Sequence, residues 1–156
     1  MSVANKTRAR PKITVRNLQR GVRVEIAPLR RFAESALGLC VQLKRNSALA
    51  AFDEISVLLI SDRRMAALHR QFLQTEGATD VITFQHGEIF ISAETARKNA
   101  ARFGKATLRR ELCLYIVHGL LHLDGFDDTT TAGAREMRNT QEKILAAAMQ
   151  PKWRPG

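Results

Sequence analysis

Apolar residues recur along the chain with two periodicities, one typical of strands and one typical of helices. Four short segments either alternate apolar and polar residues or run together in β-branched residues, as strands do: 13–17, 54–61, 79–84 and 88–92. Five longer segments repeat apolar residues every three or four positions, as helices do: 28–40, 62–76, 92–102, 108–123 and 131–149. The order β-α-β-α-β-β-α-α-α predicts an α/β (α+β) fold, with a small mixed sheet of about four strands covered by about five helices.

Individual residues mark where these elements begin and end. Pro28 opens the first helix, Asp62 is expected to cap the second, and Ser92 starts the third. Residues 85–87 join two short strands into a predicted hairpin. Gly125 ends the fourth helix, because glycine favours the backbone conformation that follows a helix.

The two ends of the chain lack apolar periodicity. We therefore expect a flexible basic arm over 1–12, a single domain over 13–150 and a short tail over 151–156. The start of the chain is polar and basic, and the longest apolar stretch, about 112–123, is too short to span a bilayer. These features predict a cytoplasmic protein with no membrane segment.

The charge is far from balanced. The chain carries 25 Lys and Arg against 15 Asp and Glu, a formal net charge of +10. Such an excess of positive charge attracts polyanions, and nucleic acid is the commonest polyanionic partner of a small basic protein. The alternative is a basic surface that only keeps the protein soluble. Cys40 and Cys113 stand singly in apolar helical segments with no CxxC pair, so we expect them to be buried in a reducing compartment.

The segment HGLLHLDGFDD, residues 118–128, carries the candidate chemistry. On a helix, His118 and His122 differ by about 400°, so both imidazoles emerge from one face and can bind one metal. Gly125 lets the chain turn back, which brings Asp128 under the same metal. The spacing is that of metzincin peptidases, with Asp128 in place of a third histidine. It predicts a metal site of His118, His122 and Asp128 that keeps an open position, as catalytic zinc requires.

Other readings of this segment stay open. Gly119 stands where those peptidases have the glutamate that activates water, which argues against a peptidase-like hydrolase. Two histidines and a carboxylate also match the ligand sets of non-haem iron oxygenases, although those are normally built on β-scaffolds. An ordinary core helix can also carry two such histidines. Asp124 and Asp127 could stay solvated, cap the last helix or orient a ligand histidine.

The same segment resembles the signature of the YbeY endoribonucleases, a family of rRNA maturation factors: H-G-x-L-H-L-x-G-[YF]-D-H. Gly119 is that family's own residue at this position. TDVITF (79–84) and GEIFIS (87–92) are similar to the family's P-T-D-V-L-S-F and G-D-I-[VF]-I segments, and MRNTQEKIL (137–145) is similar to its closing helix. The resemblance covers residues 50–148, roughly.

This resemblance implies a metal-dependent, single-strand-specific endoribonuclease, a hydrolase with one divalent metal, usually Zn²⁺. It implies a role in rRNA processing and ribosome maturation, with ribosomal RNA and ribosomal components as partners; we expect a monomer. The charge of +10 suits that substrate, because Lys and Arg neutralise phosphates. A metal acting as a Lewis acid, a metal-supplied hydroxide and attack by the RNA's own 2′-OH stay open as mechanisms.

Two positions depart from the family's pattern. Asp128 replaces the third histidine, which keeps an oxygen ligand but makes the site less positive. In HRQFLQTEGATDV, His69 takes the place of the family's Asn, and Leu73 takes the place of an Arg expected to grip phosphate. Arg70 could substitute for that Arg, or it is a solvated surface charge. This leaves open a catalytically weakened ribosome-binding or RNA-binding factor that keeps the fold and the metal site.

A run of Lys and Arg between two helices is the candidate RNA-binding surface. A solvated helix face is the alternative. The residues of the run are Arg97, Lys98, Arg102, Lys105, Arg109 and Arg110.

Overall fold

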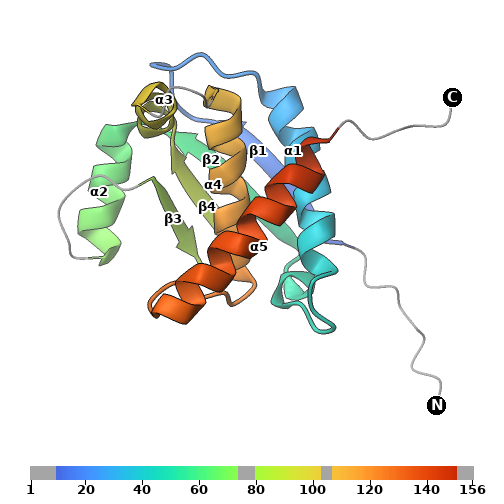
Figure 1. Cartoon of the computed structure of the whole chain (residues 1–156). Coiled ribbons are helices and arrows are strands. Elements are labelled where there is room, and N and C mark those ends of the chain that lie inside the picture. The colour runs from blue at the N-terminus through green and yellow to red at the C-terminus, as the bar shows by residue number, and fades with distance from the viewer. Residues whose placement is uncertain (1–9, 74–79, 103–106, 151–156) are drawn as a thin grey trace, which may run out of the picture.

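The computed structural model describes residues 10–73, 80–102 and 107–150. In these ranges the chain forms one four-stranded sheet and five α-helices, with a short 3₁₀ helix (Figure 1). The predicted α/β fold with a small mixed sheet is confirmed. In chain order the elements are β1 (Lys12–Asn17), α1 (Ile26–Val41), η1 (Ala48–Ala51), β2 (Glu54–Ile60), α2 (Asp62–Leu73), β3 (Val81–Phe84), β4 (Glu88–Ser92), α3 (Ala93–Arg102), α4 (Leu108–Leu123) and α5 (Thr131–Met149).

The sheet has the order β1-β2-β4-β3. β1 and β2 pair in parallel, as do β2 and β4, whereas β3 runs antiparallel to β4. Apolar residues lie beside one another across the parallel strands, where Val15 pairs with Val57 and Val57 with Ile89, and all three are buried. The β3–β4 hairpin turns at residues 85–87, as predicted.

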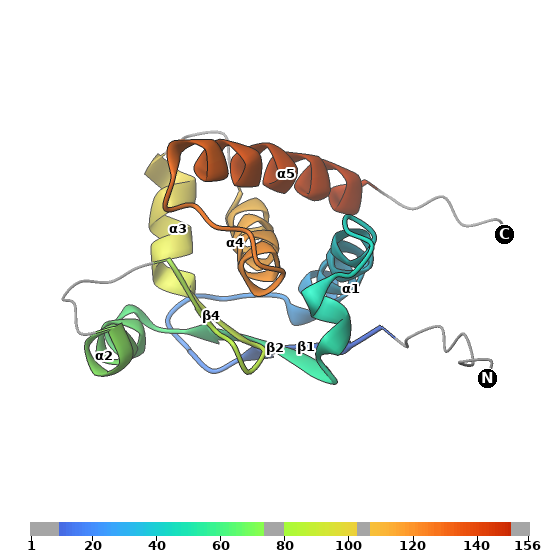
Figure 2. The same ribbon diagram turned by 90° about the horizontal axis from the view of Figure 1, so that it is seen from below.

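Most of the helices lie on one face of the sheet. Figure 2 shows α1, α4 and α3 above the sheet and α5 across the outer side of α4. α4 therefore packs against α1, α3, α5, β3 and β4, and 10 of its 16 residues are buried. α2 covers part of the opposite face, where Met65 packs with Ile60 and Ile82. The helix that carries His118 and His122 is thus enclosed by its neighbours.

Two helix starts differ from the predicted ones. α1 begins at Ile26, so Pro28 stands third in the helix, in the first turn, where backbone N–H groups lack helical acceptors anyway. Ser61, and not Asp62, caps α2, because the Ser61 hydroxyl accepts a hydrogen bond from Arg64 N at 3.2 Å. The Asp62 carboxylate instead accepts hydrogen bonds from side chains around the start of α3.

The sheet reaches slightly further toward the N-terminus than predicted. Lys12 is the first residue of β1, and its N–H donates to Asp53 O at 3.0 Å, so Lys12 belongs to the sheet and not to the arm. Residues 1–9 of the predicted arm, the tail over 151–156 and the predicted end of the second helix at 74–76 lie outside the described residues. Among the helices of the described ranges, none has the length and apolar character needed to cross a membrane.

Both cysteines are free and buried, as predicted. Burial raises the pKa of the Cys40 thiol to about 12, and the nearby Asp124 carboxylate adds to that effect. Burial also raises the pKa of the Cys113 thiol to about 12, although Arg109 opposes the shift. Thiols held in the neutral form are poor nucleophiles and poor metal ligands, so these cysteines act as core residues.

Candidate metal centre

The three residues predicted as metal ligands meet where α4 ends. His118 Nε2 and His122 Nε2 lie 3.0 Å apart, and Asp128 Oδ2 lies 3.8 Å from His122 Nε2. One ligand atom of each residue lies within 4.8 Å of the other two. Two nitrogens that bind one tetrahedral ion at about 2.0–2.1 Å are separated by roughly 3.3 Å, so this spacing suits a shared metal.

The turn after α4 returns the chain toward the histidines. Gly125, with φ of +93°, follows the helix in the left-handed conformation that glycine adopts easily. Its N–H donates to His122 O at 3.0 Å, and Phe126 N donates to Leu121 O at 3.0 Å. This pair of bonds is a complete Schellman motif, which satisfies the last carbonyls of the helix and reverses the chain. Asp128 reaches the two histidines because of this turn.

Gly119 lies where α4 rests on the sheet. A Cβ atom at this position would stand 2.6 Å from Ile89 Cγ2 and 3.0 Å from Ile89 Cδ1. Position 119 therefore faces β4 and has no room for a side chain. A glutamate here, as in the peptidases with the same spacing, would have to displace the core, which explains the glycine sterically and weakens the peptidase hypothesis.

Gln141 on α5 contacts the far side of His118. Gln141 Oε1 lies 2.9 Å from His118 Nδ1. An amide oxygen only accepts, so this contact favours the neutral tautomer with its proton on Nδ1, in which Nε2 is free to bind a metal. Histidines that bind metals commonly donate their other N–H in this way. Sequence reasoning missed Gln141, although it lies in MRNTQEKIL (137–145), the segment that resembles the family's closing helix.

The two remaining aspartates of the segment have other partners. Asp124 is buried, and its Oδ1 accepts hydrogen bonds from Ser47 Oγ at 2.7 Å and Ala48 N at 2.9 Å, which ties α4 to η1. Asp127 accepts from Thr129 N at 2.9 Å and from Thr129 Oγ1 at 2.8 Å, and so shapes the loop before α5. Within the described ranges, neither belongs to the group of possible metal ligands.

The environment of His122 favours its neutral form. Burial lowers the pKa of the His122 imidazole, and the adjacent His118 lowers it further, against the opposing effect of Asp128. A neutral imidazole is the form that binds a metal. The electrostatics of the site are therefore compatible with metal binding at neutral pH.

The predicted RNA-facing run lies toward the other end of α4. Arg109 and His118 are nine positions apart on α4, about 14 Å along the helix axis. Lys98 Nζ pairs with Asp62 Oδ2 at 3.0 Å, and Arg109 pairs with Glu25 at 3.4 Å. The structure thus does not bring this part of the run to the ligand group.

The rest of the run shows similar exposed contacts. Arg110 pairs with Glu142 at 3.5 Å, Arg97 Nη1 donates to Gly21 O at 3.4 Å, and Lys105 lies outside the described residues. Exposed ion pairs contribute about 0–1 kcal/mol, so these cations can exchange their partners for phosphates. RNA binding by the run stays a prediction.

Arg70, the predicted substitute for the missing phosphate-gripping arginine, lies on α2. It is exposed in the last turn of that helix. Near that turn, the half-exposed ring of Phe72 contacts Phe84 on β3, with 5.2 Å between the ring centroids. Figure 1 shows β3 and β4 between α2, the helix that carries Arg70, and α4, the helix that carries the two histidines. Its contribution stays a prediction.

Comparison with known proteins identifies the family of the chain. A family model described as Endoribonuclease YbeY matches residues 14–149. An Endoribonuclease YbeY from Thermus thermophilus is 37% identical over 129 residues, which cover 70% of this chain and 91% of that protein. One from Bacteroides thetaiotaomicron is 38% identical over 100 residues, covering 60% of this chain and 72% of its own length.

A solved structure has the same fold. The solution structure of a protein from Thermotoga maritima superimposes with a TM-score of 0.61 at 25% identity, and covers 87% of this chain and 88% of its own. The family model spans nearly the whole described domain, including both histidines and the helices that pack around them. The chain therefore belongs to the Endoribonuclease YbeY family.

Proposed function

We propose that this protein is a metal-dependent, single-strand-specific endoribonuclease that acts in rRNA processing and ribosome maturation. The observation that carries the proposal is the group of His118, His122 and Asp128 at the end of α4, whose ligand atoms lie within 4.8 Å of one another. Family membership supports the reaction, and the net charge of +10 supports a polyanionic substrate. We further propose a cytoplasmic monomer whose partners are ribosomal RNA and ribosomal components.

The donor set favours zinc. Two imidazole nitrogens and one carboxylate oxygen are common zinc ligands, and three protein ligands leave a position for water or substrate. The carboxylate of Asp128 also widens the choice toward manganese or iron, because oxygen is a harder donor. A divalent ion held here would polarise a phosphoryl oxygen or acidify a bound water.

Residues around the ligand group favour metal binding by orienting one histidine and keeping the other neutral. Gln141 fixes the ring orientation of His118, and burial keeps His122 neutral. Position 119 supplies no general base, because a side chain there would collide with Ile89. A peptidase-like reaction thus lacks its usual water-activating group, whereas RNA brings its own nucleophile in the 2′-OH.

A cleavage assay with matched substrates tests the proposal. Metal-loaded protein should cut a single-stranded rRNA fragment and leave the same sequence intact when it is annealed to its complement. His122→Ala should lose this activity, while His86→Ala, which changes an exposed histidine in the β3–β4 turn, should retain it. Equal background cutting by wild type and His122→Ala would reject the nuclease.

A second candidate function has one specific observation in its favour. Leu73 stands where the family pattern has a phosphate-gripping arginine, which suggests a ribosome-binding or RNA-binding factor with weakened turnover. Such a factor would bind single-stranded RNA as tightly as the nuclease but would not cut it. The same assay separates the two functions when RNA binding is measured alongside cleavage.

A further inference from the structure

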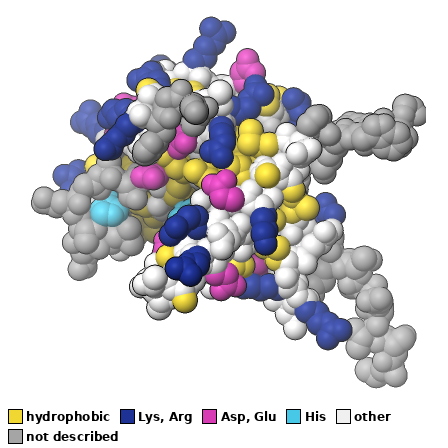
Figure 3. All heavy atoms as spheres, viewed as in Figure 1, with side chains coloured by type: hydrophobic (Ala, Val, Ile, Leu, Met, Phe, Trp, Pro, Cys, Tyr) yellow, Lys and Arg dark blue, Asp and Glu magenta, His cyan; other side chains and the backbone are white. Residues whose placement is uncertain are grey.

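Two recesses meet at the metal centre and differ in charge. One, of about 220 Å³, is lined by His118, Asp128, Ala134, Met137, Arg138 and Gln141. The other, of about 210 Å³, is lined by Asp80, Val81, Leu114, Tyr115, His118 and Gln141. Figure 3 shows a hollow on this face with hydrophobic side chains in its floor and cationic side chains beside it. Arg138 is the one cation among the residues that line these two recesses.

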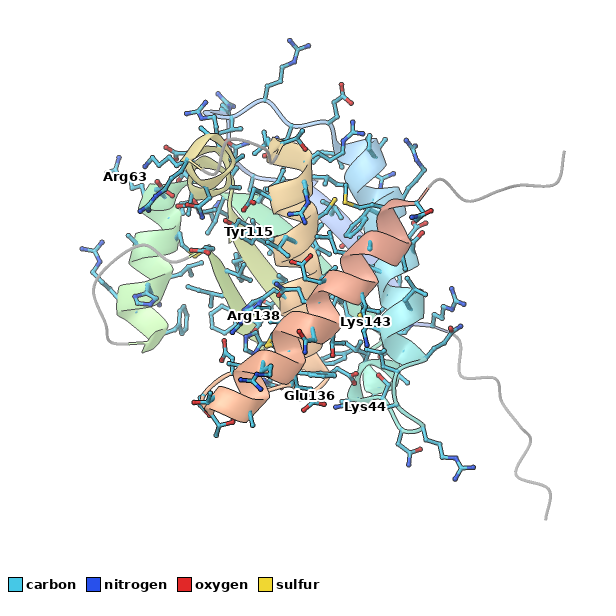
Figure 4. The ribbon with its side chains drawn as sticks, in the orientation of Figure 1. Lys44, Arg63, Tyr115, Glu136, Arg138 and Lys143 are labelled. Carbon is cyan, nitrogen blue, oxygen red and sulfur yellow. The ribbon has the colours of Figure 1, made fainter. Side chains whose placement is uncertain are left out.

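Arg138 reaches this recess from α5. Ala134, Met137, Arg138 and Gln141 follow the spacing i, i+3, i+4, i+7, so they share the helix face that contacts the metal centre. Side chains on a helix lean toward its N-terminus, which directs Arg138 over the turn nearest Asp128. In Figure 4, Arg138 leaves α5 on the side of β3, whereas Lys143 lies on the other side of the helix.

The Arg138 guanidinium has no competing partner in the described ranges. No ion pair or hydrogen bond joins it to another described residue, and Glu142, one turn later on α5, pairs with Arg110 at 3.5 Å. The nearby Asp128 carboxylate does not pair with Arg138, and its Oδ2 lies 3.8 Å from His122 Nε2. A guanidinium offers a planar fork of donors that matches two phosphate oxygens, so an unpaired Arg beside a metal site suits a phosphodiester.

We infer that Arg138 binds the RNA phosphate adjacent to the scissile bond, in the recess between α5 and the metal centre. This inference rests on the proposed nuclease function for its substrate. Asp80 has no Lys or Arg beside it in the second recess, whereas Arg138 offsets the carboxylate of Asp128 in the first. The RNA backbone therefore runs on the Arg138 side of His118, and a nucleoside faces Asp80 and Tyr115. Arg138 thereby supplies the phosphate contact that Leu73 cannot make, from a different helix.

The test compares Arg138→Gln with Lys143→Gln. Both variants remove one positive charge from an exposed position on α5, so general electrostatics changes equally. Binding of a fluorescein-labelled, unstructured single-stranded RNA is measured by anisotropy in chelator, where no cleavage occurs, over a series of salt concentrations. Arg138→Gln should weaken binding by about tenfold, as expected for a hydrogen-bonded ion contact. It should also reduce the salt slope of log K by about 0.7, the value for one phosphate on a single strand.

Lys143→Gln should change affinity less than about twofold, because a solvated charge contributes little. Equal losses in both variants would overturn the inference, since they would reflect net charge alone. Loss of bound metal from Arg138→Gln would also overturn it, because Arg138 would then act by holding Asp128. If the wild type binds RNA without cutting it and Arg138→Gln still binds more weakly, the phosphate site stands while the proposed nuclease fails.

Discussion

Each of the two ring nitrogens of His118 contacts a different neighbour. Nδ1 lies 2.9 Å from Gln141 Oε1, and Nε2 lies 3.0 Å from His122 Nε2. At this scale, a metal site depends on a hydrogen bond outside the ligand set, because the bond holds the ring in one orientation and one tautomer.

Replacing Gln141 with Leu should therefore weaken metal binding without unfolding the protein. Loss of such a partner typically costs about 10–100-fold in metal affinity, and leucine fills similar space without accepting a hydrogen bond. Competition with a chromogenic chelator measures the affinity. Asn139→Leu, on the exposed side of α5, is the control and should bind metal as the wild type does. Equal affinities for wild type and Gln141→Leu would show that the ring needs no such support.

The residues of the site divide into those that sequence could predict and those that it could not. His118, His122 and Asp128 lie within eleven residues of one another on a helix and its terminal turn, so local geometry places them together. Gln141 and Arg138 come from α5. Their approach depends on how α5 docks across α4, which is a tertiary property that periodicity does not encode.

At the scale of elements, α4 packs tightly on the sheet at Gly119. Gly119 makes this possible, because a Cβ atom there would stand 2.6 Å from Ile89 Cγ2 on β4. Apolar periodicity predicted both elements and their order. Periodicity could not predict that α4 and β4 meet at Gly119. It also could not predict that Ser61 rather than Asp62 caps α2, because the choice between two neighbouring residues depends on the final path of the backbone.

Gly119→Ala should thus destabilise the protein. In an exposed helix this change would stabilise by about 1 kcal/mol, but overpacking a core typically costs about 1–3 kcal/mol. Chemical denaturation measures the difference. In an Ile89→Ala background, which removes the colliding atoms, the penalty of Gly119→Ala should disappear. If Gly119→Ala alone were as stable as the wild type, this would contradict the close packing of α4 on β4.

At the scale of the whole molecule, the main core beneath α1 and α4 also keeps both thiols out of solvent. Burial raises the pKa of Cys40 and Cys113 to about 12. The pKa of each thiol rises because burial favours the neutral thiol over the charged thiolate. Both cysteines become accessible only when the core opens.

Thiol labelling at pH 8 should therefore report unfolding. With a pKa of about 12, the folded protein holds roughly 10³-fold less thiolate at this pH than an unfolded chain with an ordinary cysteine pKa. Reaction with a disulfide reagent should be slow in buffer and fast in denaturant, with both thiols reacting. Rapid labelling of a native thiol would show that the core around it opens locally.

The proposed nuclease function depends on the candidate metal centre formed by His118, His122 and Asp128. Metal analysis of protein purified without chelators tests it most directly. Wild type and His86→Ala should each carry a single equivalent of a divalent transition metal, and His118→Ala should carry none. Metal-free wild type, or equal metal content in wild type and His118→Ala, would contradict a metal site at the end of α4.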